Sequence, residues 1–102
     1  MPESEEHKRL RGQAASILQS YGWSVTHDNG DTSIPDIKAT KGLETWLIEI
    51  EWSGSNIEID LEQGAEIFVT TPDKLDEINR KVKWRAPVVD IDGFRSEVVN
   101  RS

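Results

Sequence analysis

The residues whose types and spacing could carry chemistry lie in a predicted β-hairpin over residues 36–52. A turn centred between Gly42 and Leu43 sets the pairing of the two strands and places Asp36 opposite Glu49. Opposed residues of an antiparallel pair share one face of the sheet, with Cβ atoms about 4.5–5.5 Å apart. Two carboxylates at that separation repel each other unless a cation lies between them. The pairing therefore suggests a site for a positive ion.

Glu51 extends this pair to a group of three acids, because it lies two residues beyond Glu49 on the same face. A cluster of oxygen ligands suits Mg²⁺ or Mn²⁺, which prefer carboxylate, carbonyl and water oxygens to nitrogen or sulfur. Lys38 shares this face, one step along the strand from Asp36. The alternative is a half-buried strand whose alternating glutamates form a solvated acidic face.

The segments around the hairpin predict the elements that position it. Apolar residues that recur every three or four positions predict a helix between Ser4, a suitable N-cap, and Gly22, a suitable residue after the C-terminus. Alternating and continuous apolar runs predict the strands. The other predicted elements are a strand over 23–27, a short helix over 56–64, a buried strand over 65–70, a helix that starts at Thr71 and ends before Ala86, and a strand over 88–91 ended by an Asp92-Gly93 turn.

Helices mixed among strands in this order predict an α/β or α+β fold with a mixed central sheet flanked by helices. A chain of 102 residues builds one hydrophobic core. We expect a single domain over residues 5–99, with flexible ends at 1–4 and 100–102. All four tryptophans are assigned to this core, with base stacking as the alternative for Trp84. His7 and His27 are expected to be solvated, with a role as ligands as the alternative.

Composition excludes several classes of protein. Nineteen acidic against twelve basic residues give a net charge of −7, which argues against a general nucleic-acid coat and a polybasic membrane binder. The absence of cysteine excludes disulfides, thiolate zinc sites and cysteine nucleophiles. No segment approaches the roughly 20 apolar residues of a membrane span. We therefore expect a cytoplasmic protein with no membrane partner.

Three segments together resemble the PD-(D/E)XK nuclease superfamily, above all its archaeal Holliday-junction-resolvase-like and restriction-endonuclease-like members. They are the helix end and strand start LQSYGWSV over residues 18–25, the Pro35-Asp36-Ile37 segment, and Ile48-Glu49-Ile50-Glu51. The resemblance covers roughly residues 5–84 and implies a restriction-endonuclease-like αβββαβ core. It also implies a metal-dependent DNA endonuclease. Asp36 and Glu49 would bind Mg²⁺ or Mn²⁺ through their carboxylates and Ile50 through its carbonyl, and the ion would activate a water molecule.

The sequence departs from the family pattern at two positions. Glu51 stands where the motif has its lysine, so Glu51 and Lys38 are both candidate catalytic residues. Arg11 stands where many relatives have a glutamate in the first helix. Two basic clusters are candidates to hold DNA phosphates on either side of the acids, although basic residues at a helix C-terminus also compensate the helix dipole. The clusters are Lys8, Arg9 and Arg11 in the first helix, and Arg80, Lys81 and Lys83 near the end of the last.

Three functions remain open at this level. The first is an endonuclease that acts on branched or duplex DNA, expected as a homodimer because two cuts on a duplex need two sites. The second is a non-catalytic module of the nuclease fold that binds nucleic acid or a protein, as part of a longer chain. The third is an unrelated acidic interaction domain.

Overall fold

The computed structural model describes residues 5–27, 36–52 and 57–102. The predicted N-cap at Ser4, the predicted turn over 28–31, Pro35 and the predicted strand end over 53–55 lie outside these residues, as does the flexible end expected at 1–4. The described elements are α1 Glu5–Ser20, β1 Ser24–His27, β2 Ile37–Lys41, β3 Glu44–Ile50, α2 Ile57–Glu62, β4 Ile67–Thr70, the 3₁₀ helix η1 Pro72–Lys74, α3 Leu75–Val82, β5 Val88–Asp90 and α4 Ile91–Arg101.

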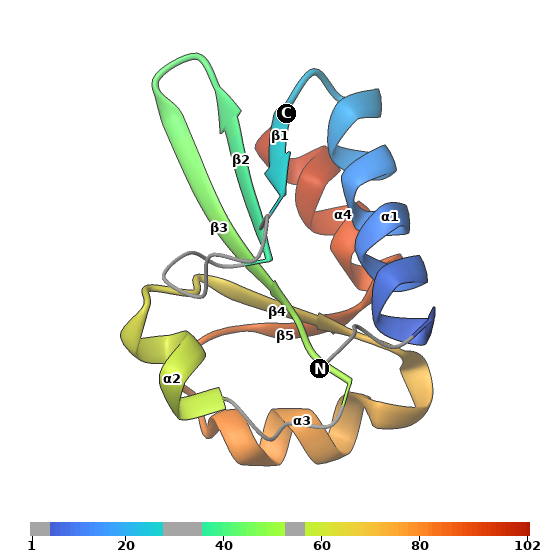
Figure 1. Ribbon diagram of the computed structural model, residues 1–102, viewed down its shortest axis with the longest axis vertical. Coiled ribbons are helices and arrows are strands. Elements are labelled where there is room, and N and C mark those ends of the chain that lie inside the picture. Colours follow the sequence, from blue (N-terminus) through green and yellow to red (C-terminus); the bar gives the residue numbers. More distant parts are fainter. Residues whose placement is uncertain (1–4, 28–35, 53–56) are drawn as a thin grey trace.

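The strands form one mixed sheet in the order β1-β2-β3-β4-β5 (Figure 1). The first three strands are antiparallel, whereas β3, β4 and β5 run parallel to one another. The β2–β3 register pairs Ile37 with Ile48 and Lys41 with Glu44, which confirms the predicted hairpin. Gly42 has a φ of +62° in the turn, a conformation that glycine adopts without a steric penalty. The chain is thus an α+β domain with a mixed open sheet, as the sequence predicts.

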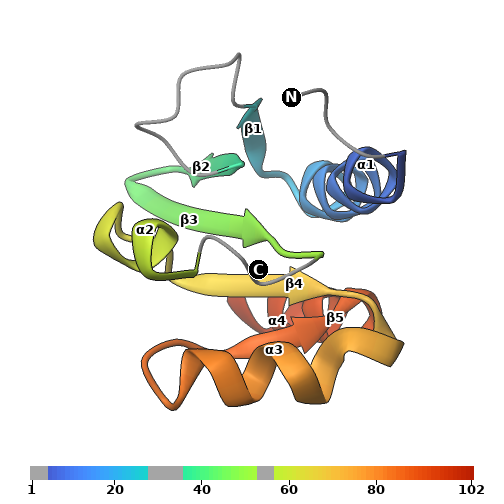
Figure 2. The ribbon, with the colours of Figure 1, turned by 60° about the horizontal axis from the view of Figure 1, so that its bottom comes forward.

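Helices cover both faces of the sheet. On one face, α1 and α4 contact each other and enclose the larger part of the core (Figure 1). On the other face, α2 and α3 enclose a smaller cluster around Phe68 of β4 (Figure 2). All residues of β4 are buried, as expected for a strand covered on both faces. None of the described helices is long and apolar enough to span a membrane.

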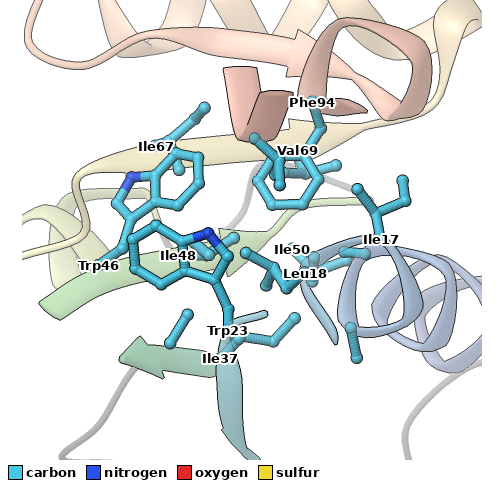
Figure 3. Packing of buried hydrophobic residues seen from close by; sticks show 14 of the residues in the cluster. Ile17, Leu18, Trp23, Ile37, Trp46, Ile48, Ile50, Ile67, Val69 and Phe94 are labelled. Carbon is cyan, nitrogen blue, oxygen red and sulfur yellow. The ribbon is translucent and has the colours of Figure 1, made fainter. Parts of the chain in front are cut away.

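Trp46 of β3 is buried in the larger cluster (Figure 3). Its ring centroid is 5.7 Å from that of Trp23 and 5.4 Å from that of Phe94, so the three rings form one continuous aromatic contact. The Arg101 guanidinium lies 4.2 Å from the Trp46 ring centroid, a cation–π distance. Trp46 therefore joins the sheet to both ends of α4.

The C-terminal part of the chain differs from the sequence prediction. Asp92-Gly93 forms no strand-ending turn but lies in the first turn of α4. The Asp90 side chain caps this helix by accepting a hydrogen bond of 2.8 Å from the Gly93 N–H, which a turn-forming acid does equally well. The helix continues to Arg101, through a segment that we expected to be flexible.

The prediction of core packing is wrong for one tryptophan. Trp23 and Trp46 are buried and Trp52 is half-buried, but Trp84 is fully exposed, with a relative accessibility of 101%. The reason is local, because α3 ends at Val82 and the two residues that follow both adopt positive φ angles. The chain turns there, and the Trp84 side chain is left in solvent.

Candidate functional site

Asp36 and Glu49 meet at the open end of the β2–β3 hairpin, where the register places them opposite each other. The Asp36 Oδ2 atom accepts a hydrogen bond of 3.0 Å from the Ile50 backbone N–H. The Glu49 Oε2 atom lies 3.3 Å from the Asp36 backbone N–H. The two carboxyl groups and the Ile50 backbone therefore occupy one small region, and the Glu49 side chain is buried there.

His7 joins this group from the first turns of α1. Its Nε2 atom is 3.2 Å from Asp36 Oδ2 and 3.1 Å from the Ile50 carbonyl oxygen. The expectation that His7 is solvated is therefore wrong. The sequence held a signal for its position, because His7 lies three residues before Leu10 and seven before Ala14, on the buried face of the same helix.

A second acidic pair lies beside the first. Glu51, just after β3, and Asp60 of α2 are both buried and share a hydrogen bond. Sequence reasoning missed Asp60, although its position three residues after buried Ile57 places it on the inward face of α2. The site thus combines four carboxyl groups and one imidazole from α1, the β2–β3 hairpin and α2.

Burial and mutual repulsion perturb the proton affinities of these acids. Burial, the hydrogen bond with Asp36 and the charge of Asp36 raise the pKa of Glu49 to about 11. Burial and the neighbouring Glu51 raise the pKa of Asp60 to about 8. Burial acts to raise the pKa of Asp36 too, but hydrogen bonds from His7 and Glu49 and the His7 charge outweigh it and lower that pKa. One carboxylate and two neutral carboxyl groups thus coexist at neutral pH.

These shifts predict how the stability of the metal-free protein depends on pH. Glu49 and Asp60 keep their protons when folded and lose them when unfolded, since their pKa values are raised from 4.5 and 3.8. These two carboxyls therefore contribute most to stability at pH values below their unfolded-state pKa values. Their contribution falls as the pH rises toward their folded-state pKa values, by up to about 1.4 kcal/mol per pH unit for each carboxyl. Urea denaturation in EDTA, from about pH 5 to about pH 8, measures this slope.

Asp60→Asn should flatten the slope, because asparagine carries no titrating proton, whereas Asp76→Asn on the exposed side of α3 should leave it unchanged. The groups that face Asp60 from other elements are Glu51 and Asp36, with His7 further along the cluster. Stability that stays constant or rises across this range would contradict the assigned protonation of Glu49 and Asp60.

The donor chemistry of the site fits a divalent cation in part. Carboxylate and carbonyl oxygens dominate it, and among the described residues the buried Asp60 Oδ2 atom has no hydrogen-bond partner. A cation would supply such a partner. In residues 5–27, 36–52 and 57–102, however, no three His, Asp or Glu side chains are arranged so that they could hold a metal ion. The Nε2 atom of His7 lies between two of the predicted ligand atoms, Asp36 Oδ2 and the Ile50 carbonyl oxygen.

The predicted basic residues do not all reach this site. Lys38 is exposed on β2, and its ammonium makes no hydrogen bond with Asp36 or Glu49 in the described structure. Lys8 and Arg9 are exposed on α1 and Arg11 is half-buried, on the helix that carries His7. The other cluster lies at the end of α3, on the opposite side of the domain from the first turn of α1 (Figures 1 and 2). Its members are Arg80, Lys81 and Lys83.

Comparison of the chain with models of protein families, with curated proteins and with solved structures found no match. The resemblance to the PD-(D/E)XK superfamily therefore stays a prediction, and the functional argument depends on the site itself.

Proposed function

We propose that this domain is a divalent-metal-dependent phosphodiesterase that cleaves DNA, built on the αβββαβ core of the PD-(D/E)XK superfamily. The observation that carries the proposal is the convergence of Asp36, Glu49 and the Ile50 carbonyl at the end of one hairpin, beside a second buried acidic pair. Buried like charges destabilise a fold, and such perturbed groups concentrate at functional sites.

In this proposal, Asp36 and Glu49 hold Mg²⁺ or Mn²⁺ through their carboxylates, and Ile50 through its carbonyl oxygen. The bound ion would polarise a phosphate and lower the pKa of a water molecule. Rigid strands suit this task better than loops, since the ligands must keep their separation. The proton that Glu49 holds beside Asp36 must leave when both carboxylates bind a cation, so metal affinity should rise with pH.

Glu51 and Asp60 are the groups available to handle protons. Glu51 occupies the position of the motif lysine, and it shares a hydrogen bond with Asp60. In the metal-free protein the pKa of Asp60 is raised to about 8, so its carboxyl can take up and release a proton near neutral pH. Lys38, exposed on β2, is the cation available to contact a phosphate of the substrate.

A second candidate function is a non-catalytic module of the same fold that binds nucleic acid or a protein. The contacts of His7 favour it, because its Nε2 atom lies between Asp36 Oδ2 and the Ile50 carbonyl, where the proposed ion would bind. In such a module, the imidazole would take the place of the ion and stabilise the acids without chemistry.

A Mn²⁺ titration monitored by the amide resonances of the protein tests the proposal. We expect paramagnetic broadening confined to residues around Asp36, Glu49 and Ile50, and cleavage of branched or duplex DNA in Mg²⁺ or Mn²⁺ but not in EDTA. Localised broadening without cleavage of any DNA would favour the non-catalytic module. The absence of localised broadening would contradict a metal site and leave either an acidic interaction domain or a non-catalytic module in which His7 occupies the position of the ion. Sedimentation of the same sample shows whether the active species is the expected homodimer.

A further inference from the structure

Trp84 is the most exposed aromatic side chain in the described part of the protein, although tryptophan is usually buried at least in part. It follows Lys83 at the end of α3. The φ angle is +52° for Lys83 and +72° for Trp84. Residues other than glycine adopt this conformation uncommonly, and Lys83 does so as the left-handed C-cap of α3. The fold thus holds a large apolar ring in water by means of a strained turn.

Basic side chains surround this ring. Four of the twelve Lys and Arg residues of the chain lie in residues 80–85, although the chain carries a net charge of −7. A pocket of about 310 Å³ beside the ring is lined by Asn79, Arg80, Lys83 and Trp84. The surface therefore combines a flat aromatic face, a hollow and cationic groups within one turn.

The four basic residues differ in whether they are paired. Lys81 lies 4.0 Å from Glu77 on the same helix. Arg85 is held in place by a bidentate ion pair with Glu58 of α2, at 2.7 and 2.8 Å, and by the Val82 carbonyl oxygen. Arg80 and Lys83 are exposed, and within the described residues neither has an ion-pair partner within 4 Å. These two side chains can therefore bind an anion without first breaking an ion pair.

We propose that this surface, formed by Asn79, Arg80, Lys83 and Trp84, binds an unpaired nucleotide, with the base stacked on Trp84 and the adjacent phosphate bound by Arg80 and Lys83. A nucleotide presents a flat π face and a negative phosphate a short distance apart, which matches a ring flanked by cations. Paired bases in a duplex hide these faces, so the surface selects single strands, junctions or flaps. Acidic peptides match the charges but offer no ring to stack.

The surface lies on the opposite side of the domain from the first turn of α1 (Figures 1 and 2), but α2 has a residue beside each region. Glu58 of this short helix pairs with Arg85 beside the surface, and Asp60, two residues on, bonds Glu51 in the acidic cluster. The inference deepens the proposed function, because it names the part of a DNA substrate that the domain holds. Nucleotide binding can be tested without metal. A failure of this inference can therefore be distinguished from a failure of the proposed metal-dependent cleavage.

Fluorescence anisotropy with labelled oligo(dT) in EDTA measures this binding. Wild-type protein should bind oligo(dT) more tightly than a blunt duplex of the same length, and Trp84→Ala should weaken oligo(dT) binding about tenfold. Trp84→Phe should restore most of the affinity, because phenylalanine also stacks. Arg80→Gln combined with Lys83→Gln should weaken binding and reduce the slope of log affinity against log salt by about 1.4, for two lost phosphate contacts.

Leu43→Ala is the matched control, because Leu43 is an equally exposed apolar side chain, at the tip of the β2–β3 hairpin, and should not affect binding. Stacking should also quench tryptophan emission, and this quenching should disappear in Trp84→Phe while binding persists. Equal affinities of wild type and Trp84→Ala, or no binding by either, would overturn the proposal. A change of oligomeric state in Trp84→Ala would overturn it too, since the ring would then belong to a protein interface.

Discussion

Glu49→Gln is expected to reduce metal-dependent DNA cleavage at least about a hundredfold. It should not destabilise the metal-free protein and should make it more stable at pH 7, because glutamine removes the cost of protonating Glu49 on folding. In the metal-free protein, burial and Asp36 raise the pKa of Glu49 to about 11, so its carboxyl is neutral at pH 7. Glutamine has the same length and is also neutral. Its amide can donate to the Asp36 carboxylate, and its carbonyl can accept from the Asp36 N–H as Glu49 Oε2 does.

The proposed metal binding needs Glu49 in its ionised form. A divalent cation requires carboxylate oxygens, and glutamine supplies only a weak neutral ligand in place of a charged one. The variant therefore separates function from folding, which a substitution by alanine would not do. Mn²⁺ affinity from amide broadening and the rate of DNA cleavage are the two measurements, and urea denaturation in EDTA checks stability.

Glu44→Gln is the control, because Glu44 is an exposed glutamate at the start of the same strand. It should retain both metal affinity and cleavage. Full cleavage by Glu49→Gln would exclude Glu49 as a metal ligand. A large loss of stability in EDTA would show instead that Glu49 is ionised in the metal-free protein.

Trp46→Ala is expected to lower the free energy of unfolding by about 3–5 kcal/mol. The side chain is fully buried and contacts Trp23, Phe94 and Arg101, so alanine would leave a large cavity in the core. Domains of this size are stable by only about 5–15 kcal/mol, so the variant should lose a large share of the total stability. Urea denaturation followed by circular dichroism measures the loss.

The chain offers a matched control in Trp84→Ala, the same chemical change at an exposed position. Because the Trp84 ring is exposed and not packed in the core, Trp84→Ala should change the free energy of unfolding by no more than about 0.5 kcal/mol. Trp46→Phe should fall between the two, since phenylalanine keeps a ring against Phe94. Equal stability of Trp46→Ala and Trp84→Ala would contradict the burial of Trp46 in the core.

Patterns of neighbouring residues predicted most of the helices and strands. They failed where the same residues are typical of two different structures. At residues 90–93, an acid followed by glycine is typical of a turn, but Asp90 is equally a good helix N-cap. The helical spacing of Ile91, Phe94 and Val98 distinguishes the two, and burial of Phe94 against Trp46 stabilises the helix. Tertiary packing therefore decided the structure of this segment.

The sequence by itself determined the β2–β3 hairpin and, with it, the meeting of Asp36 and Glu49. Both follow from short-range chemistry, namely a glycine that accepts a positive φ in the turn and an alternation that sets which residues share a face. Only the tertiary structure decided that His7 and Asp60 complete the acidic cluster and that Trp84 is left in solvent. Those outcomes depend on where α1 and α2 pack against the sheet and on how the chain leaves α3. Such long-range contacts are formed by the whole core and are not encoded in any single segment.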